Sequence, residues 1–109
     1  MNQTSLNKVF SALSDPTRRG MLAQLASGES NVSSLADQYE ISQPAISKHL
    51  RVLEDAGLIT RKKHGRQNIV RVNPKPIEEA ETWIGHYARF WRQQFDDVEQ
   101  YLEAKKQLK

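Results

Sequence analysis

The sequence predicts a mainly helical domain that contains one small β-hairpin. Apolar residues recur at helical spacing in several short stretches of the 109-residue chain. Two β-branched runs flank the sequence HGRQ, as expected of two strands joined by a turn. A longer segment near the end of the chain returns to helical spacing. The length suits a single domain over residues 1–109, with a core at 6–75 and a terminal helix at 76–109.

The first two helices are predicted by their apolar faces and by the residues between them. The apolar face of the first helix consists of Leu6, Val9, Phe10 and Leu13. That of the second helix consists of Met21, Leu22 and Leu25. Asp15 is a suitable N-cap for the second helix, and Pro16 suits its first position because the missing N–H has no partner there. Gly28 is a plausible end of this helix.

Two further helices are expected before the hairpin. A short one runs from about Ser33 to Gln38, and the turn YEIS follows it. Ser42 or Gln43 caps the next helix, with Pro44 in its first turn. The buried face of this fourth helix consists of Ile46, Leu50 and Leu53, and Gly57 ends it.

The hairpin and the last helix complete the predicted fold. LITRKKHGRQNIVRV forms two short strands with Gly65 at or near the turn. NPKP then interrupts the chain, and one long helix is expected from about Ile77.

Positive charge is confined to the middle third of the sequence. Residues 41–75 carry eight basic side chains against Glu54 and Asp55, although the net charge of the whole chain is only +3. The eight are Lys48, Arg51, Arg61, Lys62, Lys63, Arg66, Arg71 and Lys75. A local basic patch on an otherwise balanced chain indicates a polyanionic partner, most often nucleic acid.

The fourth helix has a face that suits DNA. Two short helices, the second bearing hydrogen-bond donors, followed by a basic hairpin are the layout of a winged helix-turn-helix. The face opposite its buried residues carries Gln43, Pro44, Ser47, Lys48 and Arg51, and it has no acid before Glu54. Glutamine and serine can contact base edges, and the cations suit phosphates or guanine.

Four stretches resemble the ArsR/SmtB family of bacterial repressors: LSDPTRRGML, LASGE, SQPAISKHLRVLEDAGLI and GRQ. The resemblance covers residues from about 6 to 75 and implies a homodimeric winged helix-turn-helix repressor that leaves its operator when an effector binds. A dimer would place two recognition helices one turn of DNA apart, matching a palindromic operator, and we expect the basic hairpin to lie on the adjacent backbone or minor groove. On the fourth helix, the residue types together with the resemblance predict DNA contacts for Ser42, Gln43, Pro44, Ser47, Lys48, His49 and Arg51. In the wing they predict contacts for Arg61, Lys62, Lys63, His64, Arg66 and Gln67.

The sequence departs from this family in two respects. Its metal-sensing members often carry a Cys-x-Cys pair or paired Asp/His ligands on the last helix, but this chain has no cysteine. Its three histidines, His49, His64 and His86, fall on different elements, whereas a metal site needs three or four convergent ligands. We therefore expect no metal and no other cofactor. Glu40 stands where relatives often have glycine, and a positive φ there costs about 1 kcal/mol.

The last helix is expected to form a homodimer. Six of the eight aromatic residues lie after residue 80, more than a small domain can cover. The predicted interface consists of Leu6, Val9, Phe10, Leu13, Ile84, Tyr87, Trp91, Phe95, Val98 and Leu102. Two alternatives stay open, namely a helix folded back on its own core and a pocket for an apolar effector.

Two residues near the predicted DNA-binding surface, Arg18 and His49, can have structural roles. Arg18 shares a face with the apolar residues of the second helix, so an ion pair with an acid of the domain, such as Glu54 or Asp55, is expected rather than a DNA contact. His49 adjoins the buried stripe of the fourth helix, and packing and a phosphate contact are equally open.

The function predicted from these features is sequence-specific transcriptional regulation, most plausibly repression. The partners would be double-stranded DNA, a second copy of the chain and an unidentified small-molecule effector, with no membrane. The rivals are a non-specific architectural DNA-binding protein and a metal-responsive repressor. No nucleophile–His–acid order or phosphate loop indicates an enzyme. Since no apolar run has the length of a membrane span or signal peptide, we expect a cytoplasmic location.

Overall fold

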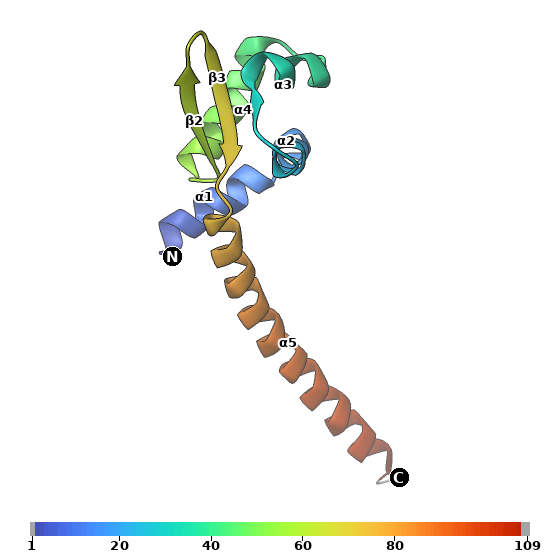
Figure 1. Ribbon diagram of the computed structural model, residues 1–109. Coiled ribbons are helices and arrows are strands. Elements are labelled where there is room, and N and C mark those ends of the chain that lie inside the picture. Colours follow the sequence, from blue (N-terminus) through green and yellow to red (C-terminus); the bar gives the residue numbers. More distant parts are fainter. Residues whose placement is uncertain (1, 108–109) are drawn as a thin grey trace. The chain divides into compact units, whose positions relative to one another are not determined.

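The computed structural model describes residues 2–107, which divide between Glu78 and Glu79 into two compact units. The first unit contains the helices α1 (Gln3–Leu13), α2 (Pro16–Ala26), α3 (Val32–Tyr39) and α4 (Gln43–Asp55), together with a small sheet (Figure 1). Helix α5 (Lys75–Gln107) begins in the first unit and makes up the described part of the second.

Side-chain caps fix where the helices of the first unit begin. The carboxylate of Asp15 accepts a hydrogen bond from the amide of Arg18 at 3.0 Å. The hydroxyl of Ser42 accepts one from the amide of Ala45 at 3.2 Å. Each bond satisfies a donor that has no carbonyl partner within its helix. The caps predicted at the starts of α2 and α4 are therefore confirmed.

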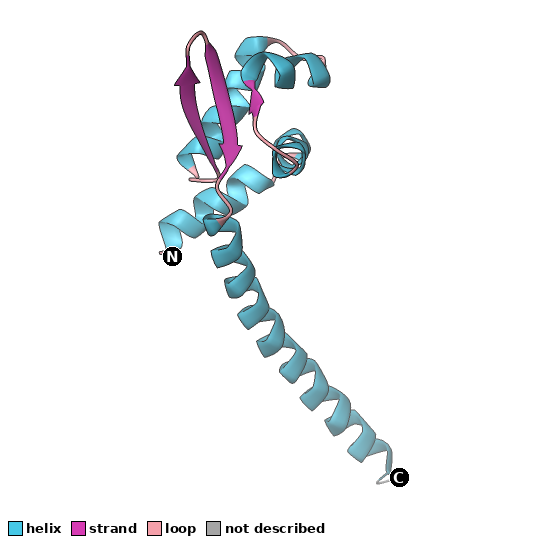
Figure 2. Ribbon diagram, in the orientation of Figure 1, coloured by secondary structure: helices cyan, strands magenta, loops and turns pink. Residues whose placement is uncertain are grey.

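A three-stranded antiparallel sheet completes the first unit (Figure 2). Its strands are β1 (Ser30–Asn31), β2 (Ile59–His64) and β3 (Gln67–Val72), in the order β1-β3-β2. The predicted hairpin is confirmed, and Gly65 supplies the positive φ of 61° that its turn requires. The sequence does not predict β1, because two polar residues offer neither alternation nor strong β-propensity. This strand pairs with β3, which brings Asn31 opposite Ile69.

The core of the first unit is apolar and holds α4 by one face. Ile46, Leu50 and Leu53 are fully buried, as the spacing predicts. Around them lie Val9, Met21, Leu25, Leu35, Leu58, Ile59 and Val70. No polar side chain is buried among the described residues. Burial of one stripe of α4 leaves the opposite stripe exposed, which determines which residues can meet a partner.

The turn of the helix-turn-helix contains a strained residue. Glu40 follows α3 with φ 51° and ψ 32°, in the left-handed region that favours glycine. Glu40 therefore has the positive φ that was predicted to be costly for a residue standing where relatives often have glycine. The strain lies at the joint between α3 and α4.

Helix α5 spans 33 residues, as the periodicity predicts, and carries a row of exposed aromatic side chains. Trp83 stacks on Tyr87 with ring centroids 5.1 Å apart, and Tyr87 meets Trp91 edge to face at 6.0 Å. Trp91 in turn lies 6.2 Å from Phe95. Within residues 2–107, no helix is both long and apolar enough to cross a membrane.

Candidate nucleic-acid interface

The exposed face of α4 carries most of the residues predicted to contact DNA. Gln43, Pro44, Lys48 and Arg51 are exposed, and Ser47 is partly exposed. Ser42 is exposed just before the helix, where its hydroxyl forms the cap. The first carboxylate of α4 is Glu54, in its last turn. The exposed face of the first three turns therefore presents hydrogen-bonding groups and positive charge, and none of the residues in these turns is an acid.

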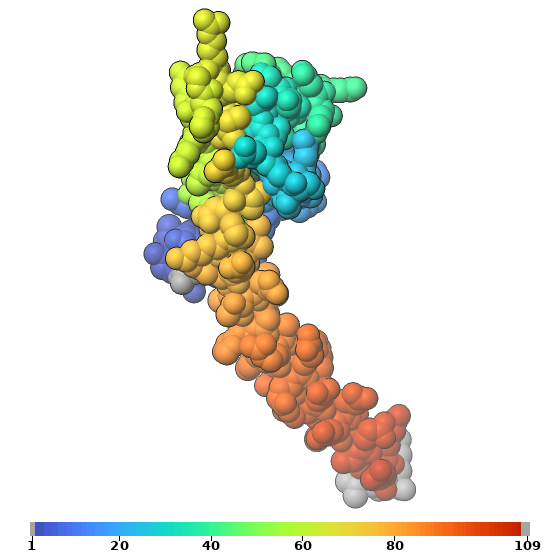
Figure 3. All heavy atoms as spheres, in the orientation of Figure 1, coloured from blue at the N-terminus to red at the C-terminus, as the bar shows by residue number. Residues whose placement is uncertain are grey.

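The hairpin of β2 and β3 forms the wing, and its tip stands clear of the neighbouring surface (Figure 3). Of the wing residues predicted to contact DNA, five are exposed: Lys62, Lys63, His64, Arg66 and Gln67. Strand pairing places His64 opposite Gln67, so both chain directions contribute to the same tip. The wing therefore offers cationic side chains beside α4.

Arg61, one of the wing residues predicted to contact DNA, already has a partner within the chain. Arg61 donates to a carboxylate oxygen of Glu54 at 3.0 Å, and both side chains are only partly exposed. This hydrogen bond holds the pKa of Glu54 below its ordinary value, against the opposing effect of burial. Arg61 thus joins the wing to the end of α4, and part of its charge is already balanced.

Arg18 has the structural role that was predicted, but its predicted partner is wrong. It forms no ion pair with Glu54 or Asp55. Instead its Nε donates to the carbonyl of Ala12 at 2.7 Å, and one terminal nitrogen donates to the carbonyl of Ser11 at 3.1 Å. Arg18 therefore caps the end of α1, and Glu54 is instead paired with Arg61.

His49 lies against this arginine rather than pointing freely outward. Its Nδ1 is 3.3 Å from a terminal nitrogen of Arg18 and 3.9 Å from a carboxylate oxygen of Asp15. The amide of Arg18 lowers the pKa of Asp15 by hydrogen bonding to its carboxylate. Because a guanidinium can only donate, a hydrogen bond from Arg18 to this Nδ1 requires the tautomer of His49 that carries its proton on Nε2. With 24% of its side chain exposed, His49 packs and can still present one donor at the surface.

A polar cleft lies where α3, α4 and the wing meet. Its volume is about 280 Å³. Gln43 and Ser47 of α4 line one side, and Arg66 and Gln67 of the wing line another. The structure thus brings together predicted residues from two separate elements. It also adds residues that the sequence reasoning missed, namely Asn31, Val32, Ser33 and Asn68.

The residues predicted to form the dimer interface differ in how exposed they are in the single chain. Leu6 and Val9 are 6% and 0% exposed, so the core of their own chain already buries them. Phe10 and Leu13 are partly exposed. On α5 the predicted residues are about half exposed or more: Ile84, Tyr87, Trp91, Phe95, Val98 and Leu102. The predicted residues that are largely exposed therefore all lie on α5.

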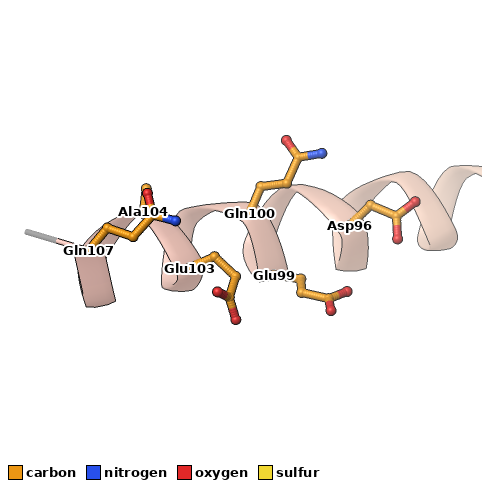
Figure 4. A pocket seen from close by; sticks show the side chains of 6 residues that line it. All are labelled: Asp96, Glu99, Gln100, Glu103, Ala104 and Gln107. Atoms are coloured by element: carbon orange, nitrogen blue, oxygen red, sulfur yellow. The ribbon is translucent and has the colours of Figure 1, made fainter.

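No metal site is found along the described residues. Between residues 2 and 107, no three His, Asp or Glu side chains are grouped so as to hold a metal ion. A shallow hollow follows the last turns of α5, where Glu99 and Glu103 point to one side of the helix and Gln100 to the other (Figure 4). Its carboxylates carry the same sign of charge as DNA, so it does not extend the basic surface.

Comparison with known proteins identifies the family. The model for "Bacterial regulatory protein, arsR family" matches residues 15–61. The transcriptional repressor SdpR of Bacillus subtilis is 34% identical over 79 residues, which are 72% of this chain and 88% of SdpR. The HTH-type transcriptional regulator Rv2034 of Mycobacterium tuberculosis is 30% identical over 92% of this chain and 91% of its own length. The structure of an ArsR-like transcriptional regulator from Rhodococcus sp. RHA1 superposes with a TM-score of 0.78 at 31% identity, covering 89% of this chain and 92% of that one. The chain therefore belongs to the arsR family of bacterial regulatory proteins, and it is a DNA-binding transcriptional regulator with the winged helix-turn-helix fold.

Proposed function

We propose that this chain is a transcriptional repressor that binds a palindromic operator as a homodimer. Helix α4 enters the major groove, and the wing lies on the adjacent backbone or minor groove. The observation that carries the proposal is the exposed face of α4, which keeps donors and cations together and has no acid before Glu54. The name of the relative SdpR as a repressor supports repression rather than activation.

Base reading is assigned to Gln43 and Ser47. Glutamine can make a bidentate contact with adenine, and serine can donate or accept. Both residues lie in the first two turns of α4, the part of a recognition helix that reaches base edges. Lys48 and Arg51, on the same exposed face, suit phosphates or guanine.

Replacement of Gln43 by alanine tests this assignment. The affinity for a duplex that the protein itself selects from a random pool should fall by about 1–3 kcal/mol, with little change on random DNA. Lys62→Ala is the matched control, because loss of a phosphate contact from the wing should weaken binding to both duplexes equally. An equal loss on both duplexes for Gln43→Ala would mean that Gln43 only positions the protein.

The homodimer is assigned to α5. Ile84, Tyr87, Trp91, Phe95, Val98 and Leu102 are separated by three or four residues, the spacing of a coiled-coil seam with one irregular step. Apolar patches of this extent usually mark an interaction site. Two protomers joined in this way would present two copies of α4 about 34–36 Å apart, one turn of DNA.

A charge placed on the seam tests the dimer. Phe95→Glu buries a carboxylate in the proposed interface, so the protein should sediment as a monomer at micromolar concentration. Gln100→Glu is the matched control, because it adds the same charge on the same helix outside the seam. If the wild-type protein sediments as a monomer, or if Phe95→Glu remains a dimer, the assignment is wrong.

We propose that release from DNA, if an effector triggers it, does not use thiolate-bound metal, because the sequence contains no cysteine. Stoichiometric zinc or cadmium should leave operator affinity unchanged. Metal-induced release would instead support the metal-responsive alternative.

A further inference from the structure

The cleft between α4 and the wing has a lining that suits one kind of group. Seven of its eight lining residues are polar, and the exception is Val32. Arg66 is the single charged residue, and no carboxylate lines the cleft. At about 280 Å³ it has the volume of roughly nine water molecules. It can therefore admit a small polar anion together with bridging water.

Arg66 differs from the two other arginines of the wing strands. Arg61 is paired with Glu54, and Arg71 is paired with Glu29. Among the described residues, no ion pair involves Arg66. Its charge is therefore not balanced by a carboxylate within the described residues, and a guanidinium fork matches two oxygens of a phosphate.

The far side of the cleft is built by the pairing of β1 with β3. Asn31 is opposite Ile69 in that pairing, so the start of α3 lies beside the first residues of β3. Ser33 and Asn68 therefore line the same cleft as Arg66. Hydroxyl and amide side chains commonly contact DNA phosphate oxygens without reading sequence.

We infer that this cleft receives one phosphate of the DNA backbone, so that the strand passes between α4 and the wing. Arg66 supplies the charge, and Ser33 and Asn68 supply neutral donors. The inference rests on the proposed DNA binding and adds to it two phosphate-contacting residues outside the recognition helix and the wing tip. A single phosphate in the cleft would then touch both α3 and the wing.

The test uses the full-length protein and a duplex selected by it from a random pool. Single methylphosphonate linkages, which remove the charge of one phosphate at a time, are placed along each half-site. One linkage per half-site should lower the affinity of the wild-type protein about tenfold or more. With Asn68→Ala or Ser33→Ala, the same linkage should cost clearly less, because the variant has already given up one hydrogen bond to that phosphate.

A second pair of variants tests the cleft by charge. Ser33→Asp places a carboxylate in the cleft, whereas Ser34→Asp places the same charge one residue further along α3, on an exposed residue outside the lining. Ser33→Asp should weaken binding at least tenfold more than Ser34→Asp, and the methylphosphonate duplex should reduce this difference. Circular dichroism establishes that both variants fold.

The outcomes separate the inference from the proposed function. If the wild-type protein selects no duplex, the proposed function fails. If it selects one, but no methylphosphonate position depends on Ser33 or Asn68 and the two aspartate variants bind equally, the cleft holds no phosphate and only this inference is overturned.

Discussion

A terminal nitrogen of Arg18 lies 3.3 Å from Nδ1 of His49, and this contact joins α2 to the recognition helix α4. The same guanidinium donates to carbonyls of Ser11 and Ala12 at the end of α1. One side chain therefore links three helices. A hydrogen bond between Arg18 and His49 requires the histidine tautomer that carries its proton on Nε2, because a guanidinium can only donate.

Arg18→Lys should lower the free energy of unfolding by about 1–3 kcal/mol, since a lysine cannot reproduce three directed contacts. Arg19→Lys is the matched control, because Arg19 is exposed and donates to one carbonyl, that of Leu13. Urea unfolding measures both variants. If Arg18→Lys is no less stable than Arg19→Lys, the link between the three helices is not important for stability.

Those features of the fold that depend on neighbouring residues could be predicted from the sequence. Spacing predicted the buried faces of α2 and α4 and half of that of α1, where Phe10 and Leu13 are only partly buried, and residue type predicted the caps at Asp15 and Ser42. The turn at Gly65 and the length of α5 follow from equally local signals.

Features that depend on contacts between distant segments could not be predicted. The strand β1 exists because β3 offers it an edge, and its two residues carry no signal of their own. The cleft depends on that pairing, so Ser33 and Asn68 were missed. Arg18 was assigned a carboxylate because charge suggested one, but carbonyls at the end of α1 were within its reach.

Acid should weaken the protein through Glu54 and Asp15. The pKa of Glu54 is lowered by the hydrogen bond from Arg61, and that of Asp15 by the amide of Arg18. A carboxyl group whose pKa is lower in the folded state stabilises it fully above the ordinary values of 4.5 and 3.8. That stabilisation is lost as the pH falls through the lower folded values.

Unfolding free energies measured between pH 7 and pH 2 should therefore decline below about pH 4.5. The double variant Asp15→Asn/Glu54→Gln should show a smaller decline, because neither amide titrates. The same decline in the variant and in the wild-type protein would assign it to other carboxyl groups.

Glu40→Gly should raise the free energy of unfolding by about 1 kcal/mol, because glycine adopts the positive φ of 51° without strain. Glu40→Gln is the control, since it removes the charge and keeps the side chain. Thermal or urea unfolding compares the three proteins. A gain for Glu40→Gln as large as that for Glu40→Gly would assign the effect to charge rather than backbone.

Arg66 and Arg61, two of the arginines of the wing, should differ in their contribution to DNA binding. Arg66→Ala should reduce the dependence of log affinity on log salt by about 1 for each phosphate that the variant no longer neutralises, or about 2 in a dimer. Arg61→Ala should reduce it less, because Glu54 already balances part of that charge. Titrations at several salt concentrations measure both slopes. If the Arg66→Ala variant has the same salt dependence as the wild-type protein, the wing does not contact DNA.

The central claim is that α4 reads a base sequence, and comparison of two duplexes tests it most directly. Affinity is measured by fluorescence anisotropy, at one fixed salt concentration, for the palindrome that the protein selects and for a scrambled duplex of the same length and composition. A repressor should bind the palindrome about 10³-fold or more tightly than the scrambled duplex. Equal affinity for the two duplexes would contradict the claim and would make the chain a non-specific architectural DNA-binding protein.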